Sequence, residues 1–190
     1  NIFAGTYGGG VFLSTNNGTN WNQTALNNRE VLSLTVNGSN IFAGTGGQGV
    51  YLSTNNGQSW SLTSLYNQYV YSLATNGTNI LAGTGNGVYL TTNNGQSWQL
   101  LLSVWVSSIA VNGTNIFVAT PGYNIYKSTN SGVSWVQVYL NNQNYIYTIA
   151  VDGVNVFAGT PTGLYHSTNN GLNWSQTTLS NQAVLCLYIN

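Results

Sequence analysis

The chain has 190 residues, of which 42% are hydrophobic and only 2% are charged, and its formal net charge is zero. A chain of this length and apolar content can form a packed domain. The protein lacks the basic surface that would bind a nucleic-acid backbone or an anionic lipid surface. No run of about 18 apolar residues is present for membrane insertion as a helix. A nearly uncharged surface also lacks repulsion between copies, so self-association is one expectation.

One phrase, Asn-Ile-Phe-Ala-Gly-Thr, opens the chain at Asn1 and returns with variation four more times. The copies start at residues 1, 40, 79, 115 and 155, so the period is close to forty residues. A period of this length is typical of repeat architectures. We therefore expect residues 1–190 to form a single domain of five related units.

Within one copy, apolar and polar residues alternate over 70–75, and Asn76-Gly77 is a hairpin signal. Further strands are expected at 79–84, 88–91 and 98–101, separated by Gly- and Asn-rich turns. No segment has a helical period. Four short antiparallel strands per repeat predict an all-β fold, a five-bladed β-propeller whose strands are designated A to D, with A innermost.

The chain starts on a B strand, and complete blades are expected to begin near Val31, Val70, Val106 and Ile146. This leaves strands B, C and D at the N-terminus and one A strand at 184–190. Pairing of these two ends would complete a fifth blade and remove the exposed edge strands. The predicted ring is therefore closed by the two ends of the chain.

A second phrase follows each copy of the first, and it reads Ser14-Thr-Asn-Asn-Gly-Thr-Asn-Trp21 in the first repeat. It resembles the Asp-box, or BNR repeat, of the form Ser-x-Asp-x-Gly-x-x-Trp, which sialidases and many secreted propellers carry. The preceding Ala-Gly-Thr strand also resembles that of secreted bacterial Asp-box proteins. The resemblance implies a propeller, an extracellular or cell-surface location, and a box that serves as a structural turn outside any active site.

This sequence departs from the family pattern because Asn stands where Asp is usual. Asn can still accept backbone N–H bonds in a turn, glycine supplies the positive φ angle, and the Trp ring can fold over the hairpin. The structural role is assigned to Asn16, Gly18, Trp21, Asn55, Gly57, Trp60, Asn93, Gly95, Trp98, Asn130, Gly132, Trp135, Asn169, Gly171 and Trp174.

The sequence offers little for catalysis. Sialidases need an arginine cluster, and this chain has one arginine, Arg29; its two carboxylates, Glu30 and Asp152, are expected on opposite faces. His166 has no Cys or carboxylate neighbour for a metal site. The lone cysteine, Cys186, lies in an apolar run and is expected to be a buried core residue. We therefore expect no enzyme activity, no metal and no cofactor.

Positions that differ between the copies are the candidates for ligand binding. In a meander blade the D–A and B–C loops share one face, and their variable residues are aromatics and amides. An aromatic ring can stack on an apolar sugar face while amides bond to hydroxyls, although the same aromatics could instead plug the channel or pack between blades. The candidates are Tyr69, Trp105, Tyr145, Tyr7, Tyr123 and Gln48.

The sequence is compatible with three functions. The first is a non-catalytic carbohydrate-binding or adhesion module outside the cell, with a neutral glycan as its partner. The second is a structural or assembly module of a surface layer or filament, with another surface protein as its partner. The third is an artificial repeat protein without a selected ligand.

Overall fold

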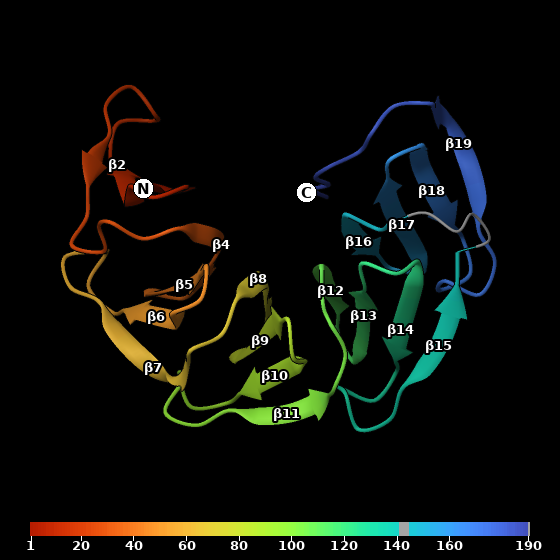
Figure 1. Ribbon diagram of the computed structural model, residues 1–190, viewed down its shortest axis with the longest axis horizontal. Helices are drawn as coiled ribbons and strands as arrows, with labels where there is room; N and C mark the ends of the chain where they lie inside the picture. Colours follow the sequence, from red (N-terminus) through yellow and green to blue (C-terminus); the bar gives the residue numbers. More distant parts are fainter. Residues whose placement is uncertain (141–144, 190) are drawn as a thin grey trace. The chain divides into compact units, whose positions relative to one another are not determined.

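The computed structural model describes residues 1–140 and 145–189, and this part of the chain contains strands β1 to β19 and no helix (Figure 1). The chain divides into two compact units, each described by itself below. The first unit comprises Asn1–Gly85 and Tyr89–Leu100, and the second comprises Asn86–Val88 and Leu101–Asn190.

The first unit contains one three-stranded sheet, one four-stranded sheet and most of a third sheet, which extends into the second unit. All pair antiparallel in chain order, so each sheet is a simple meander. The strands are β1 (Ile2–Thr6), β2 (Gly10–Ser14) and β3 (Asn22–Gln23); β4 (Val31–Asn37), β5 (Asn40–Thr45), β6 (Gly49–Ser53) and β7 (Ser61–Tyr66); and β8 (Val70–Asn76), β9 (Asn79–Thr84), β10 (Val88–Thr91) and β11 (Gln99–Leu102).

The second unit contains two four-stranded meanders, and Figure 1 shows the strands of each lying side by side in chain order. They are β12 (Ser108–Asn112), β13 (Asn115–Ala119), β14 (Asn124–Ser128) and β15 (Val136–Tyr139); and β16 (Thr148–Asp152), β17 (Asn155–Thr160), β18 (Gly163–Ser167) and β19 (Ser175–Ser180). Four complete A–B–C–D repeats and a leading B–C–D set are therefore confirmed. These five sheets fit a five-bladed propeller.

Two details of the predicted inner strands differ from the structure. Strands β12 and β16 begin two residues after Val106 and Ile146, although both residues are fully buried. At the C-terminus, residues 184–189 form no strand; beyond the bond from the Val184 N–H to the Thr160 carbonyl (3.0 Å), no ladder engages this segment. Cys186 is consequently exposed, so the prediction of a buried thiol is wrong.

Each Asp-box turn is organised around one buried hydroxyl. In the second repeat the Gly57 N–H donates to Ser53 Oγ (2.8 Å), and Ser53 Oγ donates to Asn55 Oδ1 (3.1 Å), which also accepts from the Ser59 N–H (2.9 Å). Asn56 and Gly57 both have positive φ angles, 55° and 81°. The hydroxyl thus satisfies polar groups that the tight turn would otherwise bury without a partner.

The box also joins neighbouring sheets on their outer side. The Gly95 carbonyl accepts from the Ser64 N–H of β7 (3.1 Å), in the preceding sheet, and Trp98 Nε1 donates to Thr63 Oγ1 (3.3 Å). A Cβ on Gly95 would come within 2.6 Å of Thr63 Cγ2, so the turn approaches β7 too closely for any side chain.

A second contact joins the sheets on the inner side. A Cβ on Gly44 of β5 would come within 2.7 Å of Val70 Cγ1 on β8, the first strand of the next sheet. Nearby, Ser33 Oγ accepts the Leu73 N–H (2.9 Å). Val70 belongs to a buried cluster with Phe42, Val50, Leu65, Leu73, Ile80 and Ala82, contributed by both sheets. The apolar core therefore lies between successive sheets, and the Gly of the Ala-Gly-Thr phrase is required for their close approach.

Replacing the buried box hydroxyl should destabilise the protein. Ser53→Ala leaves the Gly57 N–H and Asn55 Oδ1 with fewer partners, which is expected to cost about 1–3 kcal/mol of unfolding free energy in urea titrations. Ser59→Ala is the matched control, because the exposed Ser59 hydroxyl only accepts from Asn55 Nδ2 (2.8 Å) and its loss should cost less than about 0.5 kcal/mol. Equal urea midpoints for the two variants would contradict the role of the hydroxyl.

Candidate ligand-binding site

The loops that follow the Ala-Gly-Thr strand share one anchor in four of the five sheets. The Thr that ends the Ala-Gly-Thr phrase turns its hydroxyl onto the far end of the loop: Thr6 Oγ1 donates to the Gly10 carbonyl (2.8 Å), Thr45 Oγ1 to that of Gly49 (2.7 Å) and Thr160 Oγ1 to that of Gly163 (2.9 Å). In the β13–β14 loop Thr120 bonds in the same way to Asn124 (3.1 Å). The loop sequence can therefore vary while its two ends stay fixed.

In the second unit this loop forms a hollow of about 310 Å³ beside Trp105. Trp105 precedes β12 and is 55% exposed, which is high for a residue of its size. The Ser107 N–H donates to the Ala119 carbonyl (2.9 Å) and so holds the segment after Trp105 against β13. The hollow is lined by Val104, Trp105, Thr120, Pro121, Gly122, Asn124 and Tyr126.

The same loop contains a strained tyrosine. Tyr123 has a φ angle of 55°, in the left-handed region that a bulky side chain seldom occupies. It is 47% exposed and lies between Gly122 and Asn124, two lining residues of the hollow. Backbone strain of this kind costs roughly 1–3 kcal/mol and is concentrated at functional sites. Tyr123 is therefore held out on the surface by its loop.

In the first unit, Tyr69 lies against the β5–β6 loop. Tyr69 pairs with Gly46 in an isolated bridge, its ring passes over Gly47, and it stacks on Tyr71 with ring centroids 6.1 Å apart. The Asn67 N–H donates to the Gln48 carbonyl (3.2 Å) in the same loop. Two predicted residues, Tyr69 and Gln48, are thus brought to one loop cluster, and both are exposed.

The remaining candidates, Tyr7 and Tyr145, are 89% and 58% exposed. Tyr7 lies in the β1–β2 loop and Tyr145 precedes β16, where the sequence places them. Their membership of one common ligand-binding face with Trp105 and Tyr69 stays a prediction.

The titratable side chains that could serve in catalysis or metal binding, His166, Glu30 and Asp152, each contact other residues of their own sheet or loop. His166 stacks on Phe157, with ring centroids 4.4 Å apart, and its Nε2 lies 3.1 Å from Asn155 Oδ1. The Glu30 carboxylate packs against Gly46, and Asp152 ends β16 opposite Asn155. Among the residues that the structure describes, no three His, Cys, Asp or Glu side chains gather in a metal-binding arrangement.

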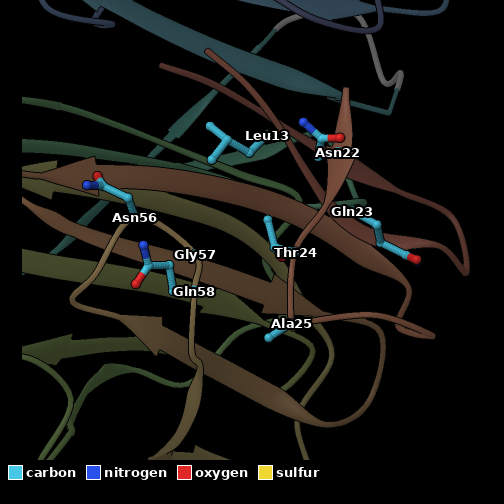
Figure 2. A pocket seen from close by; sticks show the side chains of 8 residues that line it. All are labelled: Leu13, Asn22, Gln23, Thr24, Ala25, Asn56, Gly57 and Gln58. Carbon is cyan, nitrogen blue, oxygen red and sulfur yellow. The ribbon is translucent and has the colours of Figure 1, made fainter. Parts of the chain in front are cut away.

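Sequence reasoning missed a set of grooves that lie between the outer strand of one sheet and the box turn of the next. The first, of about 340 Å³, is shown in Figure 2, with Asn22, Gln23, Thr24 and Ala25 on one side and Asn56, Gly57 and Gln58 on the other. A groove of about 210 Å³ lies at the same place one repeat later, around Thr63 and Gly95. A single repeat gives no signal for them, because each groove needs residues of two successive repeats.

These sheets and their shared turns define a repeat protein of the β-propeller class. The BNR/Asp-box repeat model matches residues 51–62, and the other four boxes share its pattern. The chain therefore carries a BNR/Asp-box repeat at residues 51–62 and resembles Asp-box proteins of the propeller type. A search of curated proteins finds no match to the sequence.

Several solved structures share this fold. One is an ancestral GH74 enzyme, with a TM-score of 0.80 and 24% identity over 95% of this chain and 30% of that chain. Another is YCF48 bound to D1 peptide, with a TM-score of 0.70 and 14% identity over 92% and 63% of the two chains. A third is the extracellular domain of a hybrid two component system from B. thetaiotaomicron, with a TM-score of 0.77 and 20% identity over 96% and 28%. This chain therefore spans less than two thirds of each, and the likeness concerns the fold alone.

Among the described residues there is no helix with the length and apolar character needed to cross a bilayer.

Removing Trp105 should leave the fold intact, whereas removing a box tryptophan should not. Trp105→Ala deletes a side chain that is more than half exposed, so the unfolding free energy is expected to fall by less than about 1 kcal/mol. Trp98→Ala removes a ring that packs on the core and bonds to Thr63, and should cost about 2 kcal/mol or more. Chemical denaturation followed by circular dichroism compares them, and a larger loss for Trp105→Ala would assign that ring to packing.

Proposed function

We propose that this protein is a non-catalytic binding module that acts outside the cell and binds a neutral carbohydrate through the hollow beside Trp105. The observation that carries the proposal is the exposed Trp105 ring on the wall of an open hollow of about 310 Å³, next to the strained Tyr123. Exposing so much aromatic surface has a cost in water that a ligand would remove.

The lining of the hollow suits a sugar. Trp105 and Tyr126 offer aromatic surface for an apolar sugar face, and the Asn124 amide offers a donor and an acceptor for hydroxyls. Charged side chains are absent from the lining residues, which favours a neutral ligand over an acidic one. The Thr120 anchor keeps the loop in shape before the ligand arrives, and preorganisation of this kind reduces the entropic cost of binding.

We infer the absence of catalysis from the number and the positions of the carboxylate side chains. Retaining and inverting glycosidases use two carboxylates about 5–10 Å apart across one bond. This chain has two carboxylate side chains in total, one in each unit, and each sits in a structural contact. The GH74 enzymes with the same fold are much longer, since this chain covers 30% and 34% of two of them, and the likeness carries the fold and not the activity. An extracellular location agrees with the extracellular domain among the similar structures.

We further infer that the ring closes through the C-terminal segment. Val184 packs on Gly159 of β17, with its Cγ1 within 2.8 Å of where a glycine Cβ would lie. Val31 and Val70, which begin the inner strands β4 and β8, pack in the same way on Gly5 and Gly44. Val184 thus has the packing of a residue that starts an inner strand. The segment that follows it is suited to pair with β1, the first strand of the three-stranded sheet.

The carbohydrate proposal is tested by glycan capture. Wild-type protein on an array of neutral glycans should bind one class with a millimolar or tighter dissociation constant, and Trp105→Ala should weaken binding about tenfold or more, since a stacked ring contributes roughly 1–3 kcal/mol. Trp105→Phe keeps an aromatic platform and should retain part of the affinity. No glycan bound at millimolar protein, or equal binding by Trp105→Ala, would overturn the proposal.

Ring closure is tested by truncation. Deleting residues 184–190 should lower the midpoint of thermal unfolding of the whole protein and should broaden the transition, because the edge of β1 would be left without a partner. The double substitution Leu185→Ser with Tyr188→Ser keeps the length of the segment and changes only exposed side chains. An unchanged melting curve for the truncated chain would refute closure.

A second candidate function is a scaffold that binds another protein. The observation in its favour is the nearly uncharged, Asn-rich surface, which lacks repulsion between molecules. YCF48, one of the proteins that share this fold, was solved with a peptide bound. Light scattering over a range of concentrations separates this candidate from the first, since a strictly monomeric particle without a protein partner in a pull-down would count against it.

A further inference from the structure

The groove between β15 and the box turn that follows β18 differs in character from its counterparts in the first unit. It has a volume of about 140 Å³ and lies wholly within the second unit. Its walls are Val136, Val138 and Leu172, with Thr129 and Ser134 at the rim and Lys127 of β14 at one end. Val136 and Leu172 are 65% and 67% exposed, so apolar surface faces water here.

The repeat provides a direct comparison for each position. Where Lys127 stands in this groove, the grooves of the first unit have Leu13 and Leu52. Where the walls here are Val136, Val138 and Leu172, the first groove has Asn22, Thr24 and Gln58. A leucine of the first groove is therefore replaced here by a charged lysine, and three of its neutral polar residues are replaced by apolar ones, while the strand and the box turn occupy the same places in the repeat.

Lys127 has no carboxylate partner among the described residues. Its Nζ lies 5.7 Å from the centroid of the Phe117 ring, a weak cation–π contact. Partial burial lowers the pKa of the Lys127 ammonium, because the charged form has lost water without gaining an anion. It is one of only two basic side chains in 190 residues, and the other, Arg29, belongs to the first unit.

We propose that this groove binds a small monocarboxylate with a short apolar body. The carboxylate would accept from Lys127 Nζ, and the apolar body would lie on Val136, Val138 and Leu172. The Ser134 hydroxyl at the rim accepts from Asn130 Nδ2 (2.9 Å), so its own proton remains available for a carboxylate oxygen. The volume of the groove limits the ligand to about the size of a single aromatic ring or a short acyl chain.

The proposal rests on the Lys127 ammonium, which has no carboxylate partner among the described residues and lies beside exposed apolar side chains. An ammonium and a carboxylate attract more strongly where apolar walls reduce the effective dielectric than they do in water. Covering the exposed methyl groups of Val136 and Leu172 removes apolar surface from water and adds to the affinity. A neutral sugar would lack the attraction between opposite charges, so this site is distinct in chemistry from the hollow beside Trp105.

Benzoate is the probe, and the side chain of Lys127 is the reporter, since the chain contains a single lysine. In ¹³C-resolved NMR, benzoate should shift the Lys127 Cε signal and the methyl signals of Val136, Val138 and Leu172, and the shifts should saturate. Benzamide, which has the same shape and no charge, should bind about tenfold more weakly, as expected for loss of a charge-assisted hydrogen bond. Affinity should also fall as the pH rises through the lowered pKa of Lys127, below its ordinary value of 10.5.

Two substitutions are expected to preserve the fold, because other repeats have the same residues at the equivalent positions. Lys127→Leu installs the residue found at Leu13 and Leu52, and Leu172→Gln installs that found at Gln58 and Gln96. Each should retain the wild-type methyl spectrum elsewhere and weaken benzoate binding about tenfold or more. The proposal would be overturned by chemical shifts that do not saturate with benzoate or by an equal affinity for benzamide. It would also be overturned if Lys127→Leu bound benzoate as tightly as the wild type, or if the signals around Leu13 and Gln58 responded equally to benzoate.

Discussion

The structure depends on a buried hydroxyl in each of its five box turns. Ser14, Ser53, Thr91, Ser128 and Ser167 are all at most 1% exposed, and each accepts the N–H of the box glycine at 2.8–2.9 Å. This bond holds the glycine in the left-handed region. In the second and third boxes the glycine carbonyl then accepts from the preceding sheet, Gly57 from the Ala25 N–H (3.4 Å) and Gly95 from the Ser64 N–H (3.1 Å). The same interaction therefore shapes the turn and joins successive sheets.

The use of Asn where the Asp-box usually has Asp has a local explanation in three boxes. Asn55, Asn93 and Asn130 each accept through Oδ1 from a backbone N–H, and each also donates through Nδ2 to a serine hydroxyl four residues ahead. A carboxylate could make the first of these bonds but could not donate the second. The amide thus makes two bonds to one serine, to its backbone and to its side chain, without adding a charge, which is consistent with a chain that has only two acidic residues.

Most of the fold could be predicted from the sequence, because the repeat phrases carry the turn and strand signals directly. The order of strands, the leading three-stranded sheet and the box turns all follow from local patterns. The state of residues 184–189 could not be predicted, because an apolar run such as Val184-Leu185-Cys186-Leu187 forms a strand only where a partner edge is available.

The residue types at the candidate site could be predicted from the sequence, but the shape of the site could not. Comparison between copies identifies Trp105 and Tyr123 as variable, but the hollow they border depends on how Thr120 folds the loop back on Asn124. The grooves beside the boxes were missed for a related reason. Their walls come from two successive repeats, so Val136 and Leu172 become neighbours only after the sheets have packed. Pattern within one repeat predicts the strands, whereas the grooves need contacts between repeats and the hollow needs a loop that differs among them.

We propose that residues shared between the repeats build the fold and that residues that differ between them bind the ligand. The most direct test is a scan of all single substitutions in which protease resistance and capture by the bound glycan are measured on the same library. We predict that substitutions at the box hydroxyls and glycines lower both signals together, and that substitutions at Trp105 and Tyr123 lower capture while resistance is kept. Loss of capture from folded variants of the box, with capture unaffected by changes at Trp105, would contradict the account.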